Sequence, residues 1–212
     1  MTHIDYTLYL VTDRSVMSAK SLEQAVEQAI QGGCTVVQLR EKYASSREFF
    51  ETAQRVKQIT DSYHIPLIIN DRTDICLAVN AAGIHIGQQD LPAKIVRSMV
   101  GPDKIIGVSA ATLSEAIQAE QDGADYLGVG AMFATSTKTN TRPVTIERLT
   151  QIKQAVQIPV VAIGGIQSSN AATLTKTGID GIAVVSAILA QENITHAAEQ
   201  LKTCFTGAEY EF

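Results

Sequence analysis

Two aspartates stand just beyond short apolar runs, where a parallel sheet would bring their side chains together. Asp71 follows the run Pro66–Asn70, and Asp90 lies a few residues after Gly83–Ile86. Two carboxylates with no His or Cys beside them suit Mg²⁺, which typically takes one or two carboxylates plus substrate phosphates. The spacing is equally compatible with Asp71 as a helix cap and Asp90 as a turn residue.

Three cations favour the metal over those structural roles. Arg40, Lys42 and Lys138 follow other apolar runs, so they would share the charge of one ligand with a metal. Arg binds phosphate as a planar fork and Lys as a point charge. Any one of the three, taken alone, is better explained as a solvated turn residue. Together with the aspartates they predict a Mg²⁺–diphosphate site.

A second anion site is indicated near the C-terminus. The run Val160–Ile163 ends in Gly164-Gly165, which can turn main-chain N–H groups towards a ligand without an intervening Cβ. The run Gly181–Val184 leads through Val185-Ser186 into a helix, whose first N–H groups have no intrahelical partner. Each run alone is an ordinary buried strand with a tight turn. At this spacing the pair favours phosphate.

The segment Thr135-Ser136-Thr137-Lys138 lies in the longest connection after a predicted strand. Its hydroxyls and its ammonium group could bind phosphate, and such a loop can close over a ligand. A hydroxyl-rich loop is also simply well solvated, so this motif is weak alone. His85 alternates within an apolar strand and is expected to be a barrel residue rather than a base.

The composition limits the classes of protein. The chain has 212 residues, 45% of them hydrophobic and 18% charged, which suits one sizeable core and one domain spanning 1–212. A net charge of -5 argues against a nucleic-acid partner. Three scattered cysteines, no signal-peptide pattern and no membrane-length apolar run indicate a reduced, cytoplasmic setting without a membrane partner. A homodimer is compatible with the sequence.

The elements that must position these residues alternate regularly. Helices open at Ser21, Ser45 and Thr112, each followed three residues later by Gln or Glu as in a capping box. The alternation implies parallel strands with right-handed crossovers, and hence an α/β fold, a single (β/α)8 TIM barrel with an eight-stranded parallel core. An open, doubly wound sheet is the alternative, but an early Gly-rich turn is missing. The expected strands are 8–12, 35–39, 66–70, 83–86, 104–109, 125–130, 160–163 and 181–185.

An ordered set of motifs spans nearly the whole chain. The motifs are Tyr9-Leu-Val-Thr-Asp13, Gln38-Leu-Arg-Glu-Lys42, Ile69-Asn-Asp-Arg72, Gly83-Ile-His-Ile-Gly-Gln-Gln-Asp90, Gly107-Val-Ser109, Ala124-Asp-Tyr-Leu-Gly-Val-Gly130, Thr135-Ser-Thr-Lys138, Ile163-Gly-Gly-Ile166 and Val184-Val-Ser186. Single motifs are weak, but the ordered set is highly specific, and it resembles the thiamin phosphate synthase family.

The resemblance implies an enzyme with two small-molecule substrates. It would join 4-amino-2-methyl-5-(hydroxymethyl)pyrimidine diphosphate to 4-methyl-5-(2-phosphoethyl)thiazole, or its 2-carboxy form, and release thiamin phosphate and diphosphate. The implied mechanism is dissociative: the diphosphate leaves, and the thiazole nitrogen captures the pyrimidine cation.

The resemblance also implies roles for particular residues. Asp71 and Asp90 would be the Mg²⁺ ligands, and Gln38 would lie near the pyrimidine. The diphosphate contacts would be Arg40, Lys42, Asn70, Ser109 and Lys138, of which all but Asn70 are expected to be catalytic. Leu39, Glu41 and Ser136 belong to the same substrate-binding segments. The thiazole-phosphate contacts would be Thr135, Thr137, Gly165, Val185 and Ser186.

The sequence departs from the family pattern at one loop. Ala131 and Ala134 stand where the family usually has Pro, so this loop is expected to be less pre-organised. Three rival functions share the barrel: a related thiazole tautomerase, a sugar-phosphate isomerase, and a silent phosphate-sensing barrel. The tautomerase would carry a His near Ala131 and lack an acid matching Asp90. The paired aspartates and the cations argue against the other two.

Overall fold

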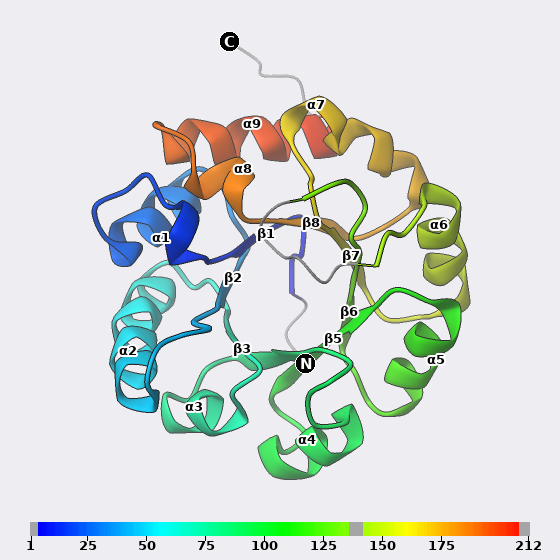
Figure 1. Cartoon of the computed structure of the whole chain (residues 1–212), viewed down its shortest axis with the longest axis horizontal. Coiled ribbons are helices and arrows are strands. Elements are labelled where there is room, and N and C mark those ends of the chain that lie inside the picture. Colours follow the sequence, from blue (N-terminus) through cyan, green and yellow to red (C-terminus); the bar gives the residue numbers. More distant parts are fainter. Residues whose placement is uncertain (1–3, 136–141, 208–212) are drawn as a thin grey trace.

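Eight parallel strands close into a barrel with helices packed around it (Figure 1). The structure, a computed structural model, describes residues 4–135 and 142–207. Strands pair in chain order, and β1 also pairs with β8, with Leu8 opposite Ile182. This closure confirms the predicted (β/α)8 barrel. The strands are β1 (Leu8–Val11), β2 (Val36–Leu39), β3 (Leu67–Asn70), β4 (Gly83–Ile86), β5 (Ile105–Ala110), β6 (Tyr126–Val129), β7 (Val160–Ile163) and β8 (Gly181–Val184).

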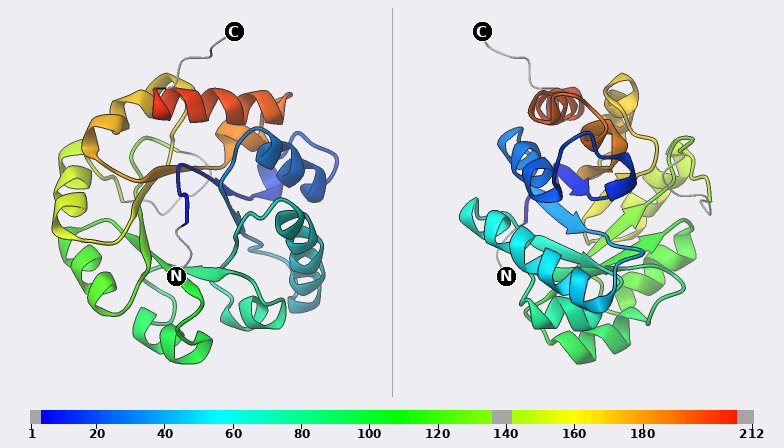
Figure 2. Two further views of the ribbon diagram at one scale, coloured as in Figure 1. Left: turned by 180° about the vertical axis from the view of Figure 1, so that it is seen from behind. Right: turned by 60° about the vertical axis from the view of Figure 1, so that its left-hand side comes forward.

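Helices surround the strands on every side, as the views from behind and from the side show (Figure 2). Within the described residues, none of these helices combines the length and apolar character needed to cross a membrane. The helices are α1 (Leu22–Gln31), α2 (Ser46–Ser62), α3 (Thr73–Ala78), α4 (Ala93–Val100), α5 (Leu113–Gln121), α6 (Ile146–Ala155), α7 (Ser168–Ala171), α8 (Ser186–Leu189) and α9 (Ile194–Thr206), with 3-10 turns η1 (Arg14–Val16) and η2 (Ala172–Thr177).

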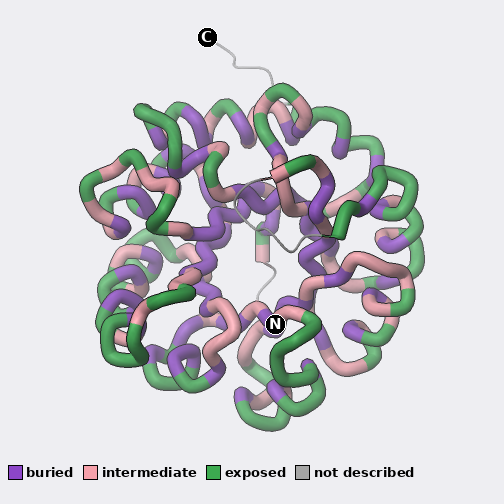
Figure 3. Tube along the Cα trace, viewed as in Figure 1, coloured by how far each residue is buried: buried purple, intermediate pink, exposed green. Residues whose placement is uncertain are grey.

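Most strand residues are buried (Figure 3). The buried apolar residues form two clusters, one that includes the helices and one inside the barrel. Alternate residues of a strand point to opposite sides. In β1, Leu8 and Leu10 pack outward against the helices, whereas Tyr9 and Val11 point into the barrel beside Tyr126. This explains why the apolar runs show no polar alternation, and it brings large polar rings into the interior.

Local capping begins the helices where the sequence predicts. Ser45 and Glu48 form a complete capping box at α2, and Thr112 and Glu115 form another at α5. At α1, the Ser21 hydroxyl accepts a hydrogen bond from the Gln24 N–H. Each cap stabilises its helix by roughly 1 kcal/mol. The caps therefore fix the residue at which each loop ends and its helix begins.

Two connections differ from the sequence expectation. The pair Leu91-Pro92 predicts a helix start, because Pro is accepted in a first turn. Helix α4 begins two residues after Leu91, at Ala93, with Pro92 as its N-cap. The connection between β7 and β8, for which the pattern predicts no helix, holds the short α7 and η2. Its sequence is rich in Ser, Thr and Asn, which compete with helical hydrogen bonds and give little amphipathic signal.

Candidate functional site

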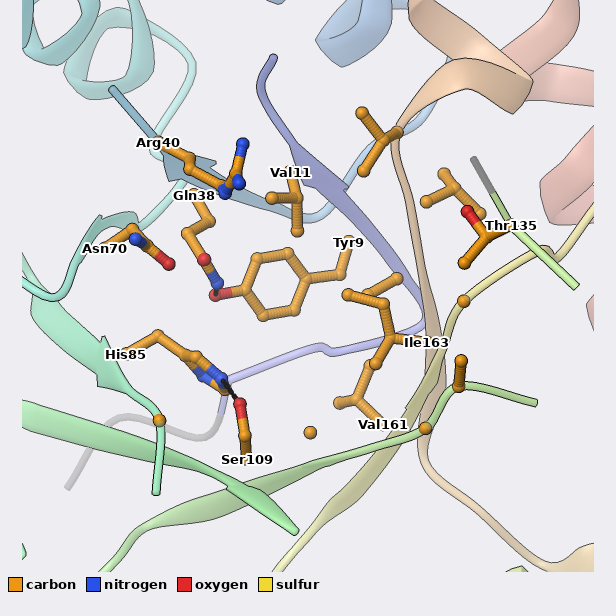
Figure 4. A pocket seen from close by; sticks show the side chains of 18 of the residues that line it. Tyr9, Val11, Gln38, Arg40, Asn70, His85, Ser109, Thr135, Val161 and Ile163 are labelled. Atoms are coloured by element: carbon orange, nitrogen blue, oxygen red, sulfur yellow. Dashed lines mark hydrogen bonds between the residues drawn. The ribbon is translucent and has the colours of Figure 1, made fainter. Parts of the chain in front are cut away.

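A pocket of about 760 Å³ opens at the carboxyl ends of the strands (Figure 4). That volume suits small organic ligands. All eight strands contribute to its wall, so residues far apart in the sequence meet there. From β1 to β8 the contributions include Tyr9, Gln38, Asn70, His85, Ser109, Tyr126, Val161 and Ala183.

The pocket brings together most of the residues predicted from the sequence. Those on its wall are Gln38, Arg40, Lys42, Asn70, Asp71, Asp90, Ser109, Thr135, Gly165, Val185 and Ser186.

Two predicted residues, Leu39 and Glu41, are not among the described wall residues. Leu39 is fully buried in the apolar layer between barrel and helices. The Glu41 carboxylate pairs with Arg14, 2.5 Å from its Nε. Ser136, Thr137 and Lys138 lie outside the described residues.

The Asp71 carboxylate lies between a cation and a second carboxylate. Lys42 Nζ is 2.6 Å from Asp71 Oδ2, and Asp71 is near enough to Asp90 for its charge to raise the pKa of the Asp90 carboxyl. Asp71 does not cap α3, whose N-cap is Arg72 without a side-chain bond. Asp71 has φ 63°, a strained value for a residue with a Cβ, and its N–H donates to the His85 carbonyl. The main chain therefore holds this carboxylate towards the pocket.

Asp90 sits in a turn, as one sequence alternative suggests, and still faces the pocket. Its Oδ2 accepts a 2.7 Å hydrogen bond from the Gly87 N–H. Burial raises the pKa of the Asp90 carboxyl; the charge of Asp71 adds to the rise, while the Gly87 N–H and Lys42 oppose it. Two carboxylates that repel one another form a place where a cation would be stabilised.

The donor set fits Mg²⁺. Among the described residues, no group of three or more His, Cys, Asp or Glu side chains could hold a metal by itself. Mg²⁺ does not need such a group, since it keeps several waters and uses one or two carboxylates plus phosphate oxygens. Asp71 and Asp90 offer those carboxylates at the edge of an open pocket.

Arg40 is positioned by its neighbours on the same wall. Its Nη1 donates a 2.8 Å hydrogen bond to Asp13 Oδ2, and its main-chain N–H donates to the Thr12 hydroxyl. The guanidinium side chain is about four-fifths buried, with 20% of its surface exposed. An arginine held in this way loses little conformational entropy when it binds an anion.

The opposite wall carries the glycine turn after β7 and the start of α8. Gly164 and Gly165 have φ 101° and 65°, which residues with a Cβ rarely adopt. A Cβ at Gly165 would lie 2.5 Å from the Ala134 carbonyl oxygen, so the turn also packs tightly against the β6 loop. Asn170 donates a 3.0 Å hydrogen bond to the Gly165 carbonyl. The main-chain N–H groups of this wall are thus held in place beside Ser186.

On the floor of the pocket, the predicted residues Gln38 and Ser109 are joined by Tyr9, Tyr126 and His85, which were not predicted as site residues. Gln38 Nε2 donates to the Tyr9 hydroxyl at 2.9 Å, and the Tyr9 and Tyr126 hydroxyls are 2.7 Å apart. His85 joins Tyr126 to Ser109, with both ring nitrogens at 2.9 Å from the hydroxyl oxygens. Figure 4 shows His85 and Ser109 facing one another across this floor. Inward-pointing Tyr and His at alternate strand positions are the signal that could have revealed the network.

The family described as thiamine monophosphate synthase matches residues 8–188, most of the chain. This chain belongs to the thiamine monophosphate synthase family. A thiamine-phosphate synthase of Ruminiclostridium cellulolyticum is 62% identical over 202 residues, which cover 95% of this chain and 96% of that protein. The family resemblance of the sequence motifs is thereby confirmed.

Solved structures agree with this family assignment. Thiamine phosphate pyrophosphorylase from Pyrococcus furiosus superposes with a TM-score of 0.89 at 40% identity, covering 96% of both chains. (S)-3-O-geranylgeranylglyceryl phosphate synthase from Thermoplasma acidophilum superposes with a TM-score of 0.73 at 18% identity, covering 96% of this chain and 94% of that one. The second likeness shows the barrel fold alone.

Ala131, where the resemblance implies Pro, makes two main-chain hydrogen bonds. Its main-chain N–H donates to the Arg142 carbonyl at 3.0 Å, and its carbonyl accepts from the Val144 N–H at 2.9 Å. Proline could not make the first bond, since it has no N–H. Arg142 also pairs with Glu115 at 2.7 Å. Hydrogen bonds therefore hold the two ends of this connection together without proline.

Proposed function

We propose that this protein is a thiamin phosphate synthase. It joins 4-amino-2-methyl-5-(hydroxymethyl)pyrimidine diphosphate to 4-methyl-5-(2-phosphoethyl)thiazole, or its 2-carboxy form, and releases diphosphate. The observation that carries the proposal is one pocket with two different anion-binding walls, in a chain of this family. One wall offers carboxylates and cations for a metal-bound diphosphate. The other offers a glycine turn and a helix start for a monophosphate.

The diphosphate would bind at the ends of β2 to β5. Asp71 and Asp90 would hold Mg²⁺, which would neutralise the charge on the departing diphosphate. Arg40 and Lys42 border the same part of the pocket and would bind the phosphate oxygens directly. Asn70 and Ser109 would add hydrogen bonds, and Lys138 is the further cation that the resemblance implies. A leaving group held in this way departs as a stabilised anion.

The thiazole phosphate would bind at the ends of β7 and β8. Gly165, Val185 and Ser186 line that wall, and Thr135 reaches it from the β6 loop. Main-chain N–H groups at a helix start favour an anion. Thr137 would add a contact to this phosphate, and Ser136 belongs to the same substrate-binding segment. The thiazole nitrogen would then face the pyrimidine across the middle of the pocket.

A dissociative reaction suits the residues between the two walls. The pocket's described wall residues include no cysteine. The Ser109–His85 pair has Tyr126, not an aspartate, on the other ring nitrogen, so it does not form a Ser/His/Asp triad. The floor instead offers hydroxyl and amide groups that can orient a planar pyrimidine. The protein would promote departure of diphosphate and hold the thiazole nitrogen ready for the cation.

The test is release of diphosphate by purified protein given both substrates, first with Mg²⁺ and then with EDTA. Release is expected only when both substrates and the metal are present, with thiamin phosphate formed in equal amount. Asp74→Asn is the matched control for Asp71→Asn and Asp90→Asn, because Asp74 pairs with Arg72 at the surface and is absent from the described pocket wall. Folded protein that releases no diphosphate would contradict the proposal and favour the tautomerase or the silent barrel.

Three further expectations accompany this function. We propose one domain over residues 1–212, a cytoplasmic enzyme, and a homodimer. Limited proteolysis, cell fractionation and light scattering test these in turn. A monomer in light scattering would remove the homodimer without affecting the proposed reaction.

A further inference from the structure

The hydrogen bonds on the pocket floor run from donor to acceptor in one direction. That direction decides whether the Ser109 hydroxyl donates or accepts a hydrogen bond in the pocket. The chain runs Gln38–Tyr9–Tyr126–His85–Ser109, with successive distances of 2.9, 2.7, 2.9 and 2.9 Å. Tyr9 and Tyr126 are 1% and 0% exposed, so water cannot replace a missing partner. The two phenol protons must therefore each find an acceptor within the protein.

The Gln38 amide sets the direction. Its Nε2 donates to the Tyr9 oxygen, so the Tyr9 proton is directed to the Tyr126 oxygen. The Tyr126 proton is then directed to His85 Nδ1. If Tyr126 instead donated to Tyr9, the Tyr9 proton would point at a donor, and a buried unsatisfied hydroxyl costs roughly 1–3 kcal/mol.

We propose that Tyr126 is a positioning residue, which holds His85 in the tautomer with its proton on Nε2 and thereby makes Ser109 a hydrogen-bond donor to the diphosphate. This inference rests on the proposed function for the role of Ser109. In this tautomer Nε2–H donates to Ser109 Oγ, and the Ser109 proton is left for an acceptor in the pocket. In the other tautomer Ser109 would donate to His85 and present only lone pairs to an anion.

Packing and acidity support the assignment. A Cβ at Gly107 would lie 2.1 Å from Cζ of Tyr126, and a Cβ at Gly128 would lie 2.9 Å from Cε1 of His85. Two strand positions therefore lack side chains where the two rings lie. Burial raises the pKa of both Tyr9 and Tyr126 well above the ordinary range, which keeps both phenols protonated as donors.

The tautomer can be measured without any substrate. The chain has 4 His residues, so two-bond ¹H–¹⁵N spectra of ¹⁵N-His-labelled protein contain few signals, and the His85 signal is the one lost in His85→Gln. We expect the Nε2–H tautomer in the wild type. Tyr126→Phe should give a mixture of tautomers. Tyr9→Phe is the matched control, because it also removes a buried hydroxyl but leaves in place the hydrogen bond that the Tyr126 hydroxyl donates to His85 Nδ1. An Nδ1–H tautomer in the wild type would overturn the proposal.

A double-mutant cycle tests the consequence for catalysis. In the background that keeps Ser109, Tyr126→Phe should lower kcat/KM for the pyrimidine diphosphate about tenfold, the loss expected for one hydrogen bond to a charged group. The same change in a Ser109→Ala background should cost less than about twofold, since Ser109 is then no longer there to be oriented. Equal losses in both backgrounds would refute the positioning role.

Failure of the inference and failure of the proposed function give different results. If the wild type forms no thiamin phosphate, the proposed function fails, while the tautomer measurement still decides the state of His85. If the wild type is active but the cycle is additive, only the positioning role fails. Thermal melting identifies a Tyr126→Phe variant that does not fold, and in that case the wild-type tautomer alone confirms or overturns the inference.

Discussion

The substitution Gly107→Ala should damage the pocket floor without removing any polar group. Gly107 lies on β5 beside Tyr126 of β6. An added Cβ would lie 2.1 Å from Cζ, 2.3 Å from Cε1 and 2.3 Å from the hydroxyl oxygen of Tyr126. Ordinary contacts between such atoms are about 3.5–4 Å. The ring is fully buried, so it cannot move aside without displacing other core residues.

The expected cost combines two effects. Overpacking of a dense core costs roughly 1–3 kcal/mol. Displacement of the Tyr126 hydroxyl also weakens its bonds to Tyr9 and His85, at about 0.5–1.5 kcal/mol each. The free energy of unfolding should therefore fall by roughly 2–6 kcal/mol, a large part of the 5–15 kcal/mol of a typical domain. A loss of about 4 kcal/mol would lower Tm by roughly 8–16 °C for a domain of this size.

Urea unfolding tests whether the clash with Tyr126 is the cause. The variants are Gly107→Ala, Gly128→Ala, Tyr126→Leu and the double variant Tyr126→Leu/Gly107→Ala. Gly128→Ala is the graded control, because its Cβ would meet His85 Cε1 at 2.9 Å, and it should cost less than Gly107→Ala. In a Tyr126→Leu background the phenol ring is gone, so Gly107→Ala should cost under about 1 kcal/mol. A cost that is the same in both backgrounds, or a wild-type cost below about 1 kcal/mol, would refute the steric explanation.

Three other results are expected. Asp71→Asn and Asp90→Asn should each lower Mg²⁺-dependent diphosphate release roughly 100-fold, the usual cost of one charge-stabilising group, while circular dichroism stays unchanged. Ser186→Ala should raise KM for the thiazole phosphate about tenfold by steady-state kinetics, through loss of one hydrogen bond to a charged group. Burial raises the pKa of Cys76 to about 11 and also raises that of Cys34, so both thiols should react slowly with a thiol reagent at pH 8.

Each of these results has an outcome that contradicts it. Normal turnover by either aspartate variant with Mg²⁺ present would remove the metal assignment. An effect of Ser186→Ala confined to the pyrimidine diphosphate would contradict two separate anion walls.

The Cys76 thiol also predicts how stability depends on pH. Its ordinary pKa of 9.0, which applies to the unfolded chain, lies below its pKa of about 11 in the folded protein. Ionisation therefore favours unfolding, and the free energy of unfolding should fall between pH 9 and about 11. Stability that rises over this interval would show that the thiol is not buried.

Much of the barrel could be predicted because its signals are local. Capping residues such as Ser45 and Thr112 act within one helical turn, and the structure confirms both boxes. Apolar runs without alternation, such as Val160–Ile163, correctly indicate strands covered on both sides. The segment 168–177 was harder, because short turns rich in Ser and Thr have no amphipathic period.

The polar residues at strand ends were also predictable, since a parallel barrel places all its carboxyl ends on one face. Asp71 and Asp90 are 19 positions apart in the sequence numbering, yet both face one pocket. The sequence motifs could not distinguish side chains that face the pocket from those beside them that do not. Leu39 and Glu41 adjoin Arg40 but turn to the helices and to Arg14.

The sequence by itself therefore determined the barrel, the family and the strand-end residues, because these follow from periodicity, caps and short motifs. Only the tertiary structure decided how the side chains inside the barrel meet. Tyr9, His85 and Tyr126 come from three strands, and their contacts depend on strand register and on the space left by Gly107 and Gly128. Such contacts join residues as many as 117 positions apart, as for the Tyr9–Tyr126 pair. Alternation along a strand can indicate that such residues point inward, but closure of the whole sheet sets which of them meet.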